Sequence, residues 1–141
     1  MKLFPWSTIE QPASEKRRRL RAEVYAERSD FFYRGERYVP TCPLCGRPLV
    51  EGVGFHMHEV LITRAGVPVT QQDAIWAKYN VILMCPRCHH KKGHSVAEEC
   101  EIYIPYLIEW YGREAIEEWL ASLPFQVETS LDYYLAGRSY H

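Results

Sequence analysis

The chain has 141 residues, of which 47% are hydrophobic and 25% charged, and a net charge of −1, which is typical of a folded globular protein. It has no apolar run long enough to span a bilayer, so we expect no membrane partner. Pro5, Glu10 and Pro12 interrupt the region where a secretory signal would need an apolar stretch, and we therefore expect a cytoplasmic protein with reduced thiols.

The two ends of the chain differ in charge. Residues 1–95 carry 15 Lys and Arg against 9 Asp and Glu, whereas residues 96–141 carry 2 against 9. Charge blocks are most often solvated faces. A basic N-terminal part followed by an acidic C-terminal part favours a nucleic-acid partner when a functional site lies in the basic part.

A basic helix is predicted near the start of the chain. Ser14 can cap a helix that begins at Glu15 and ends near Ser29, because this segment has good helix formers with acidic and basic residues four positions apart. Residues 30–40 then form an aromatic and basic linker or a short strand.

The middle of the chain predicts a strand, a helix and a second strand. Residues 52–63 are typical of a strand, and a turn around Gly66 ends it. Residues 70–80 are predicted to form a short helix capped by Thr70. The apolar residues 81–84 then form a short buried strand.

The last part of the chain predicts helices. The helical pattern begins at Ser95, is interrupted by Gly112 and ends at Pro124, and Pro105 should kink or divide the first helix. Aromatic residues recur at helical spacing, which favours packing surface over a platform for stacked bases. These residues are Tyr103, Tyr106, Trp110 and Trp119.

Four cysteines form two matched Cys-x-x-Cys turns, Cys42 with Cys45 and Cys85 with Cys88. Two intervening residues let one turn present both sulfurs to a tetrahedral ion. A four-sulfur site leaves zinc no open position for a substrate, so we predict a structural Zn²⁺ rather than a redox pair. Cys100 is left over and is predicted to be a small buried residue on a helix.

Five of the six histidines lie close to these cysteines. His56 and His58 are on the predicted strand between the two turns, and His89, His90 and His94 follow the second turn. A single histidine on a strand is usually a packed or solvated residue. Five of them beside a metal site, on the basic half of the chain, indicate a function beyond packing.

The segments CPLCG, HMHEVLI and NVILMCPRCHHKKGH resemble the HNH endonucleases, and small phage-encoded members look most similar. The resemblance covers roughly the middle third of the chain. In that family a histidine lies on a hairpin strand, an asparagine lies in the loop, and a last histidine opens the helix. Asn80, the apolar strand, Cys85, Cys88 and His89 match this order, and many members also carry a four-cysteine zinc.

The resemblance implies an α+β fold with a ββα-metal (His-Me finger) core and a four-cysteine zinc clamp. Residues 1–141 would form one domain, with a basic helical extension at 1–38, the zinc-clamped HNH core at 39–95 and acidic helices at 96–141. The implied activity is that of a hydrolase, an endonuclease that cuts DNA phosphodiester bonds with one further cation, Mg²⁺, Mn²⁺, Ni²⁺ or Zn²⁺. A monomer would nick DNA and a dimer could cut both strands; a phage-encoded member would act in the cytoplasm of a bacterial host.

The strand motif leaves two assignments open. If Met57 and His58 are the family's adjacent pair, His58 is the base; if His58 and Glu59 are the pair, His58 is a ligand and Glu59 the base. A neutral imidazole near pKa 6.5 is suited to proton transfer, whereas a glutamate is a weaker base unless it is desolvated. His56 could assist in either case. Asn80 would hold the hairpin or orient the base.

The helix motif also leaves its ligands open. His90 and His94 are four residues apart and suit one face of a regular helix, whereas His89 and His94 need a distorted turn that Gly93 permits. The number of residues from Asn80 to the histidine after the second cysteine turn favours His89 as the chief ligand. The expected order of ligands is therefore His89, His94 and His90, with His56 as a further candidate.

Basic residues beside these motifs are predicted to contact DNA phosphates without reading sequence. They are Arg17, Arg18, Arg19, Arg87, Lys91 and Lys92. The alternative function is a DNA-binding or phage packaging module with a weak or inactive catalytic site, which the irregular histidine motifs suggest. A third alternative is a protein partner bound to the acidic C-terminal helices.

Overall fold

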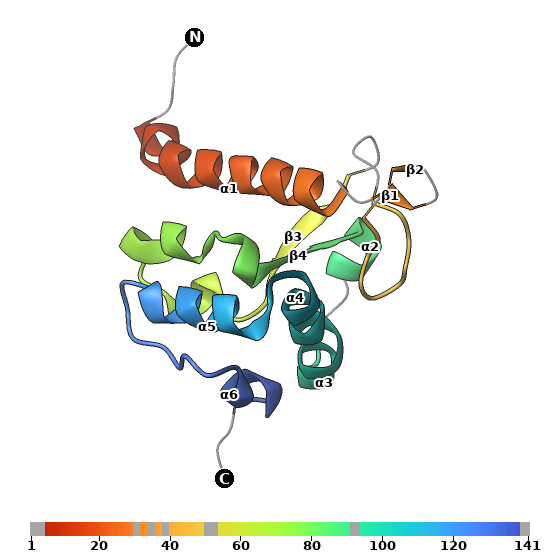
Figure 1. Cartoon of the computed structure of the whole chain (residues 1–141). Helices are drawn as coiled ribbons and strands as arrows, with labels where there is room; N and C mark the ends of the chain where they lie inside the picture. The colour runs from red at the N-terminus through yellow and green to blue at the C-terminus, as the bar shows by residue number, and fades with distance from the viewer. Residues whose placement is uncertain are drawn as a thin grey trace.

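The structure is a computed structural model, and it describes residues 5–29, 32–33, 36–37, 40–49, 54–90 and 94–138. Helices are combined with small two-stranded antiparallel sheets, which confirms the expected α+β class. In Figure 1, helix α1 (Pro5–Ser29) lies along one side of the hairpin formed by β3 (His56–Glu59) and β4 (Val81–Met84), and the C-terminal helices lie on the other side.

Helix α1 is longer than predicted. It ends at Ser29 as expected, but it begins at Pro5 rather than at Glu15. Proline suits the first position of a helix because its missing N–H has no helical partner there. Ser14 therefore lies inside the helix, and the prediction that it caps the start is wrong.

Arg28 anchors the end of α1 in the core. Its side chain is completely buried and donates a hydrogen bond to the carbonyl of Val81 at 2.9 Å. Its guanidinium also lies 5.3 and 5.7 Å from the ring centroids of Tyr106 and Tyr111. These contacts join α1 to β4 and to the helix that carries both tyrosines.

The strands are shorter than predicted. A first pair, β1 (Phe32–Tyr33) and β2 (Glu36–Arg37), forms within the expected linker or strand region. Strand β3 occupies only four positions of the predicted strand 52–63, of which residues 52–53 lie outside the described part. The chain leaves the sheet after Glu59, because the next backbone N–H groups bond to Asn80 instead of to a partner strand. The register pairs His56 with Met84.

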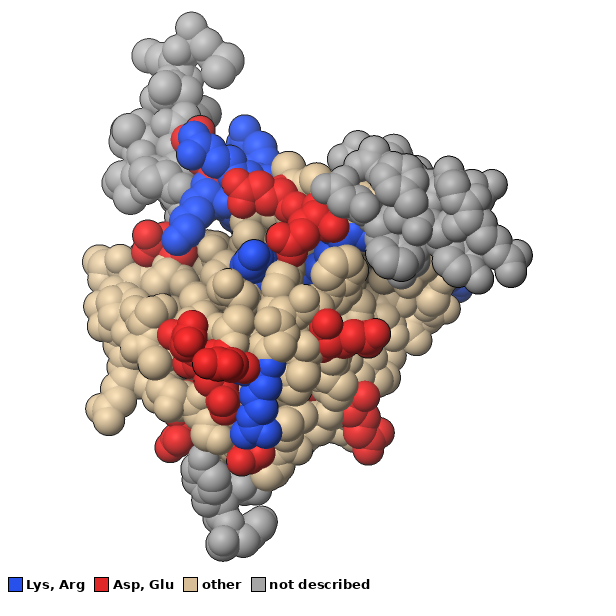
Figure 2. Space-filling model, in the orientation of Figure 1, with Lys and Arg blue, Asp and Glu red and all other residues tan. Residues whose placement is uncertain are grey.

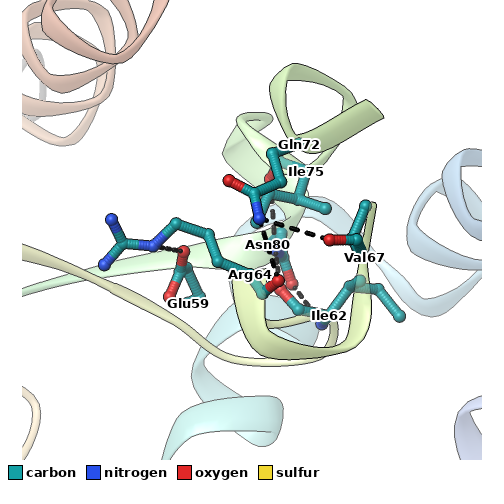
Figure 3. A network of polar contacts seen from close by, with 7 residues as sticks. All are labelled: Glu59, Ile62, Arg64, Val67, Gln72, Ile75 and Asn80. Atoms are coloured by element: carbon teal, nitrogen blue, oxygen red, sulfur yellow. Dashed lines mark hydrogen bonds and ion pairs between the residues drawn. The ribbon is translucent and has the colours of Figure 1, made fainter. Parts of the chain in front are cut away.

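Asn80 holds the loop between β3 and β4 (Figure 3). Its Oδ1 accepts the backbone N–H of Ile62 at 2.9 Å, and also that of Leu61, which the figure does not draw, at 2.8 Å. Its Nδ2 donates to the carbonyls of Ile62 and Ile75 at 2.8 and 3.1 Å. The side chain is completely buried, and all four hydrogen-bonding positions of its amide are used. One side chain therefore sets the path of the loop.

The helix predicted over 70–80 is replaced by short 3₁₀ helices. They are η1 (Arg64–Gly66), η2 (Val69–Ile75) and η3 (Lys78–Asn80). The prediction that Thr70 caps a helix is wrong, because Thr70 lies inside η2 and Pro68 precedes it. The helix is broken at Trp76 and Ala77, whose ψ angles of 81° and 151° are not helical.

The helical division of the last part of the chain is confirmed as far as Pro124, but a further short helix, α6 (Leu131–Leu135), lies beyond it and was not predicted. Pro105 is the second residue of its helix and follows a π-helical segment, and Gly112, with φ of 85°, separates that helix from the next. The bounds are α2 Pro86–His89, α3 Val96–Glu98, η4 Glu99–Tyr103, α4 Ile104–Tyr111, α5 Arg113–Ser122 and α6 Leu131–Leu135.

The core lies between the hairpin and the helices on both of its sides. It joins Val24 of α1, all four residues of β4, and Tyr103, Leu107 and Ile116 from the C-terminal helices. Within the part of the chain that the structure describes, no helix has both the length and the apolar character that crossing a membrane requires.

We expect Asn80→Ala to lower the free energy of unfolding by about 3 kcal/mol, because it leaves buried backbone groups of the loop without partners. Gln72→Ala is the matched control, since Gln72 also bonds loop carbonyls but lies nearer the surface, and it should cost less than about 1 kcal/mol. Urea denaturation measures both. Equal losses in the two variants would contradict the role given to Asn80.

Candidate metal centres

Four sulfur atoms converge at one end of the hairpin. Cys42 and Cys45 lie in a tight turn that is closed by a 2.8 Å hydrogen bond from the Gly46 N–H to the Cys42 carbonyl. Gly46 has φ of 76°, a conformation that favours glycine. Cys85 directly precedes α2, and Cys88 lies in it. The four sulfurs lie within 4.8 Å of one another.

The chemistry of this cysteine group suits a metal ion. All four are free thiols, and Sγ of Cys45 lies 3.6 Å from Sγ of Cys85, far beyond the length of a disulfide bond, about 2.05 Å. Burial raises the pKa of the Cys42 and Cys88 thiols, whereas a hydrogen bond from the Arg47 backbone lowers the pKa of Cys45 to about 7. Four sulfurs at this spacing can hold a tetrahedral ion such as zinc.

The cysteine group also fixes the position of the short helix α2, which carries Cys88. Helix α2 spans only Pro86–His89, and a single turn is not stable by itself in water. Its bonds from His89 N–H to the Cys85 carbonyl and from His90 N–H to the Pro86 carbonyl are each 3.0 Å long. The sulfurs at its two ends therefore determine where His89 and His90 lie.

All five histidines singled out in the sequence converge beside the cysteine group. Their rings form a continuous chain of contacts in the order His90, His56, His89, His58 and His94. The centroid distances along this chain are 4.9, 4.7, 6.1 and 4.1 Å. Two of the rings come from β3 on the same face, because strand side chains alternate.

His56, His89 and His90 form a three-histidine group that could hold a metal ion, since each offers a ring nitrogen within 4.8 Å of the others. Nδ1 of His89 is buried and has no hydrogen-bond partner among the described residues. Burial lowers the pKa of His56 and of His89, and the positive charge of Arg17 lowers both further. These shifts favour the neutral form of His56 and His89, which is the form that binds metals.

His58 and His94 form a second pair beside this group. Burial lowers the pKa of His58 to about 4, and its Nε2 is buried without a hydrogen-bond partner in the described residues. Nδ1 of His94 lies 2.9 Å from the hydroxyl of Tyr103, which is completely buried at the end of η4. The sequence predicted Tyr103 as packing surface, and no motif signalled its contact with His94.

The predicted spacing of ligands along one helix does not apply. Helix α2 ends at His89, and His94 lies beyond it, so His94 shares a helical face with neither His89 nor His90. His89 and His90 instead meet the same partner, His56. Gly93, the residue expected to permit a distorted turn, lies outside the described residues.

Glu59 lies on the opposite face of β3 from His58. Its Oε1 forms an ion pair with Nε of Arg64 at 2.8 Å, as Figure 3 shows. Burial raises the pKa of Glu59, and the charge of Arg64 opposes this effect. The structure therefore brings His58, and not Glu59, to the other histidines. Arg64 was not singled out in the sequence.

Of the basic residues predicted to contact DNA, those that the structure describes are divided between two helices. Arg17 and Arg18 line a groove beside His56, whereas Arg19 is paired with Glu15 at 2.9 Å. Figure 2 shows Lys and Arg gathered over α1, with acidic side chains between them, and more acidic side chains over the C-terminal helices. Arg87 is exposed on α2; Lys91 and Lys92 lie outside the described residues.

Comparison with protein-family models, curated proteins and solved structures gives no match.

The two candidate centres differ in how many coordination positions they would leave open. A four-sulfur group is closed around its ion, whereas three imidazoles leave coordination positions for other ligands.

We expect the purified protein to contain one tightly held zinc ion per chain at the cysteine group. Cys88→Ser should lose this ion and unfold at lower temperature, because metal binding to such a group contributes directly to folding. Cys100→Ser is the matched control and should keep the ion, since Sγ of Cys100 bonds the carbonyl of Tyr134 instead. Elemental analysis and thermal denaturation measure both, and protein purified without chelators that contains no metal would contradict the assignment.

We expect a second, weaker ion at the three-histidine group of the zinc-loaded protein. His56→Gln should weaken its binding by at least about tenfold, since even residues that only support a ligand cost that much. Glu59→Gln, on the other face of β3, should leave binding unchanged. Calorimetric titration with Ni²⁺ measures the affinity, and equal effects of the two substitutions would overturn the site.

Proposed function

We propose that the chain is a metal-dependent endonuclease of the HNH type, with a ββα-metal core formed by β3, β4 and α2. The observation that carries this proposal is the open three-histidine group beside a closed four-cysteine group, at the end of one hairpin. His58 supports it further, because a neutral imidazole lies against the metal-binding histidines.

In this proposal the two metal centres have different roles. The cysteine group holds a structural Zn²⁺, and His56, His89 and His90 hold one divalent cation. When bound there, the cation supplies positive charge to a phosphate oxygen and to the leaving oxygen. Imidazole ligands suit Zn²⁺ and Ni²⁺, whereas Mg²⁺ and Mn²⁺ are better suited to oxygen ligands. We therefore expect activity to be higher with Zn²⁺ or Ni²⁺ than with Mg²⁺.

His58 is the general base in this proposal. Burial lowers its pKa to about 4, so the ring is neutral and can accept a proton, although the lowered pKa makes it a weaker base than an ordinary imidazole. Its Nε2 is buried without a partner in the described residues, so we assign the proton transfer from the attacking water to Nδ1. His94 packs against the His58 ring at 4.1 Å and is itself oriented by the Tyr103 hydroxyl. These contacts restrict the His58 ring to one position, which general-base catalysis needs.

Glu59 and Asn80 have supporting roles. The ion pair with Arg64 favours the assignment in which His58, rather than Glu59, is the base. Asn80 has no amide position left to orient a base, since the loop uses all four, and this supports its role in holding the hairpin. The DNA strand is the proposed partner, bound through its phosphates by Arg17 and Arg18 of α1, which line the groove beside His56. Arg19 is paired with Glu15 and takes no part in this proposal.

We expect the zinc-loaded protein to convert supercoiled plasmid to nicked or linear DNA when Ni²⁺ or Zn²⁺ is added. His58→Ala should lower the rate at least about 100-fold, because a general base contributes that much, and should keep both metals. Glu59→Gln should cut at close to the normal rate. Agarose electrophoresis follows the cleavage, and elemental analysis follows the metals.

The same assay separates the alternatives. If the protein cuts no better than His58→Ala with any of the four cations, the enzyme proposal fails. DNA binding without cleavage would then identify the alternative, a zinc-dependent DNA-binding or packaging module. A larger loss in Glu59→Gln than in His58→Ala would reverse the assignment of the base.

A further inference from the structure

A groove of about 240 Å³ connects α1 with the three-histidine group. It combines basic side chains from the helix with residues of the hairpin, and His56 belongs both to the groove and to the histidine group. An occupant of the groove therefore touches a residue of the candidate metal centre. The groove is lined by Arg17, Arg18, Arg21, Phe55, His56 and Met57.

The basic side of the groove is one face of α1. Arg21 is three residues after Arg18 and four after Arg17, spacings that place side chains on the same face of a helix. Arg21 is already fixed, because it donates to the Phe55 carbonyl at 2.8 Å and its guanidinium lies 3.9 Å from the centre of the Phe55 ring. A guanidinium has five N–H donors, so it keeps donors for a further acceptor.

The floor of the groove is apolar and closed. Phe55 and Met57 are only 4% and 5% exposed. The ring of Phe55 is stacked on Tyr25 at 4.8 Å and covered by Arg21, so it has no free face on which a base could stack. Arginines above an apolar floor suit a phosphate and its sugar better than a base.

The neighbouring basic residues of α1 have other partners. Arg19 is paired with Glu15 at 2.9 Å, and Lys16 donates to the Asp73 carbonyl at 2.7 Å. Of the three arginines that line the groove, Arg17 also lies over the Trp76 ring at 5.1 Å. The positive charge of the helix is therefore not uniform, and three arginines gather where the groove meets His56.

We infer that this groove is a binding subsite for a phosphodiester group that neighbours the phosphate at the three-histidine group. The substrate is accordingly a polynucleotide strand that runs along α1, rather than an isolated small diester. The inference rests on the proposed nuclease function, and it adds Arg21 to the residues that contact the strand.

The test compares two exposed arginines of α1 on two substrates. Arg18→Ala removes a charge from the groove, and Arg19→Ala removes the same charge beside it. With an oligonucleotide, Arg18→Ala should raise KM about tenfold, because it removes a charge-assisted hydrogen bond to phosphate. With bis(p-nitrophenyl) phosphate, which has one phosphodiester group, it should change neither KM nor kcat. Arg19→Ala should leave both substrates unaffected.

The subsite is overturned if Arg18→Ala and Arg19→Ala change the KM for the oligonucleotide equally. It is also overturned if Arg18→Ala raises the KM for the small diester as much as the KM for the oligonucleotide. If the protein hydrolyses neither substrate, the nuclease proposal fails separately. Fluorescence anisotropy with the labelled oligonucleotide then decides the subsite: weaker binding by Arg18→Ala than by Arg19→Ala supports it, and equal binding overturns it.

Discussion

The convergence of four sulfur atoms within 4.8 Å is the constraint on which the rest of the site depends. It joins the turn at residues 40–49 to the end of β4 and to α2, although these segments are far apart in the chain. Helix α2 has only four residues and could not persist by itself. His89 and His90 therefore owe their positions to the cysteines, and a metal at the cysteine group would stabilise the candidate second centre as well as the fold.

The hairpin provides the other half of the site, through two simple geometric rules. Side chains alternate along β3, so His56 and His58 face α2 while Glu59 points away to Arg64. The loop between the strands could bend in many ways, but the buried amide of Asn80 bonds to it at four points and leaves one path. The strand positions of the histidines thus depend on a residue that lies outside their cluster.

The three-histidine group and the groove would together suit the chemistry of a phosphodiester. Phosphate is anionic, and a cation held by the three histidines would lie beside the arginines of α1. Acidic side chains lie over the C-terminal helices (Figure 2), and whereas burial lowers the pKa of His58, the charge of Glu98 in α3 acts on His58 to raise it. An attractive region on one side of the hairpin would orient an approaching strand before any specific contact forms.

The sequence by itself determined the features that depend on local spacing: the two Cys-x-x-Cys turns, the buried strand Val81–Met84, and the division of the C-terminal helices at Gly112. It also indicated that the histidines form a cluster, but not which of them meet. Only the tertiary structure decided that His56 joins His89 and His90 and that Tyr103 reaches His94. These contacts cross between a strand, a one-turn helix and a π-helical segment, whose relative positions are set by packing and not by periodicity along the chain.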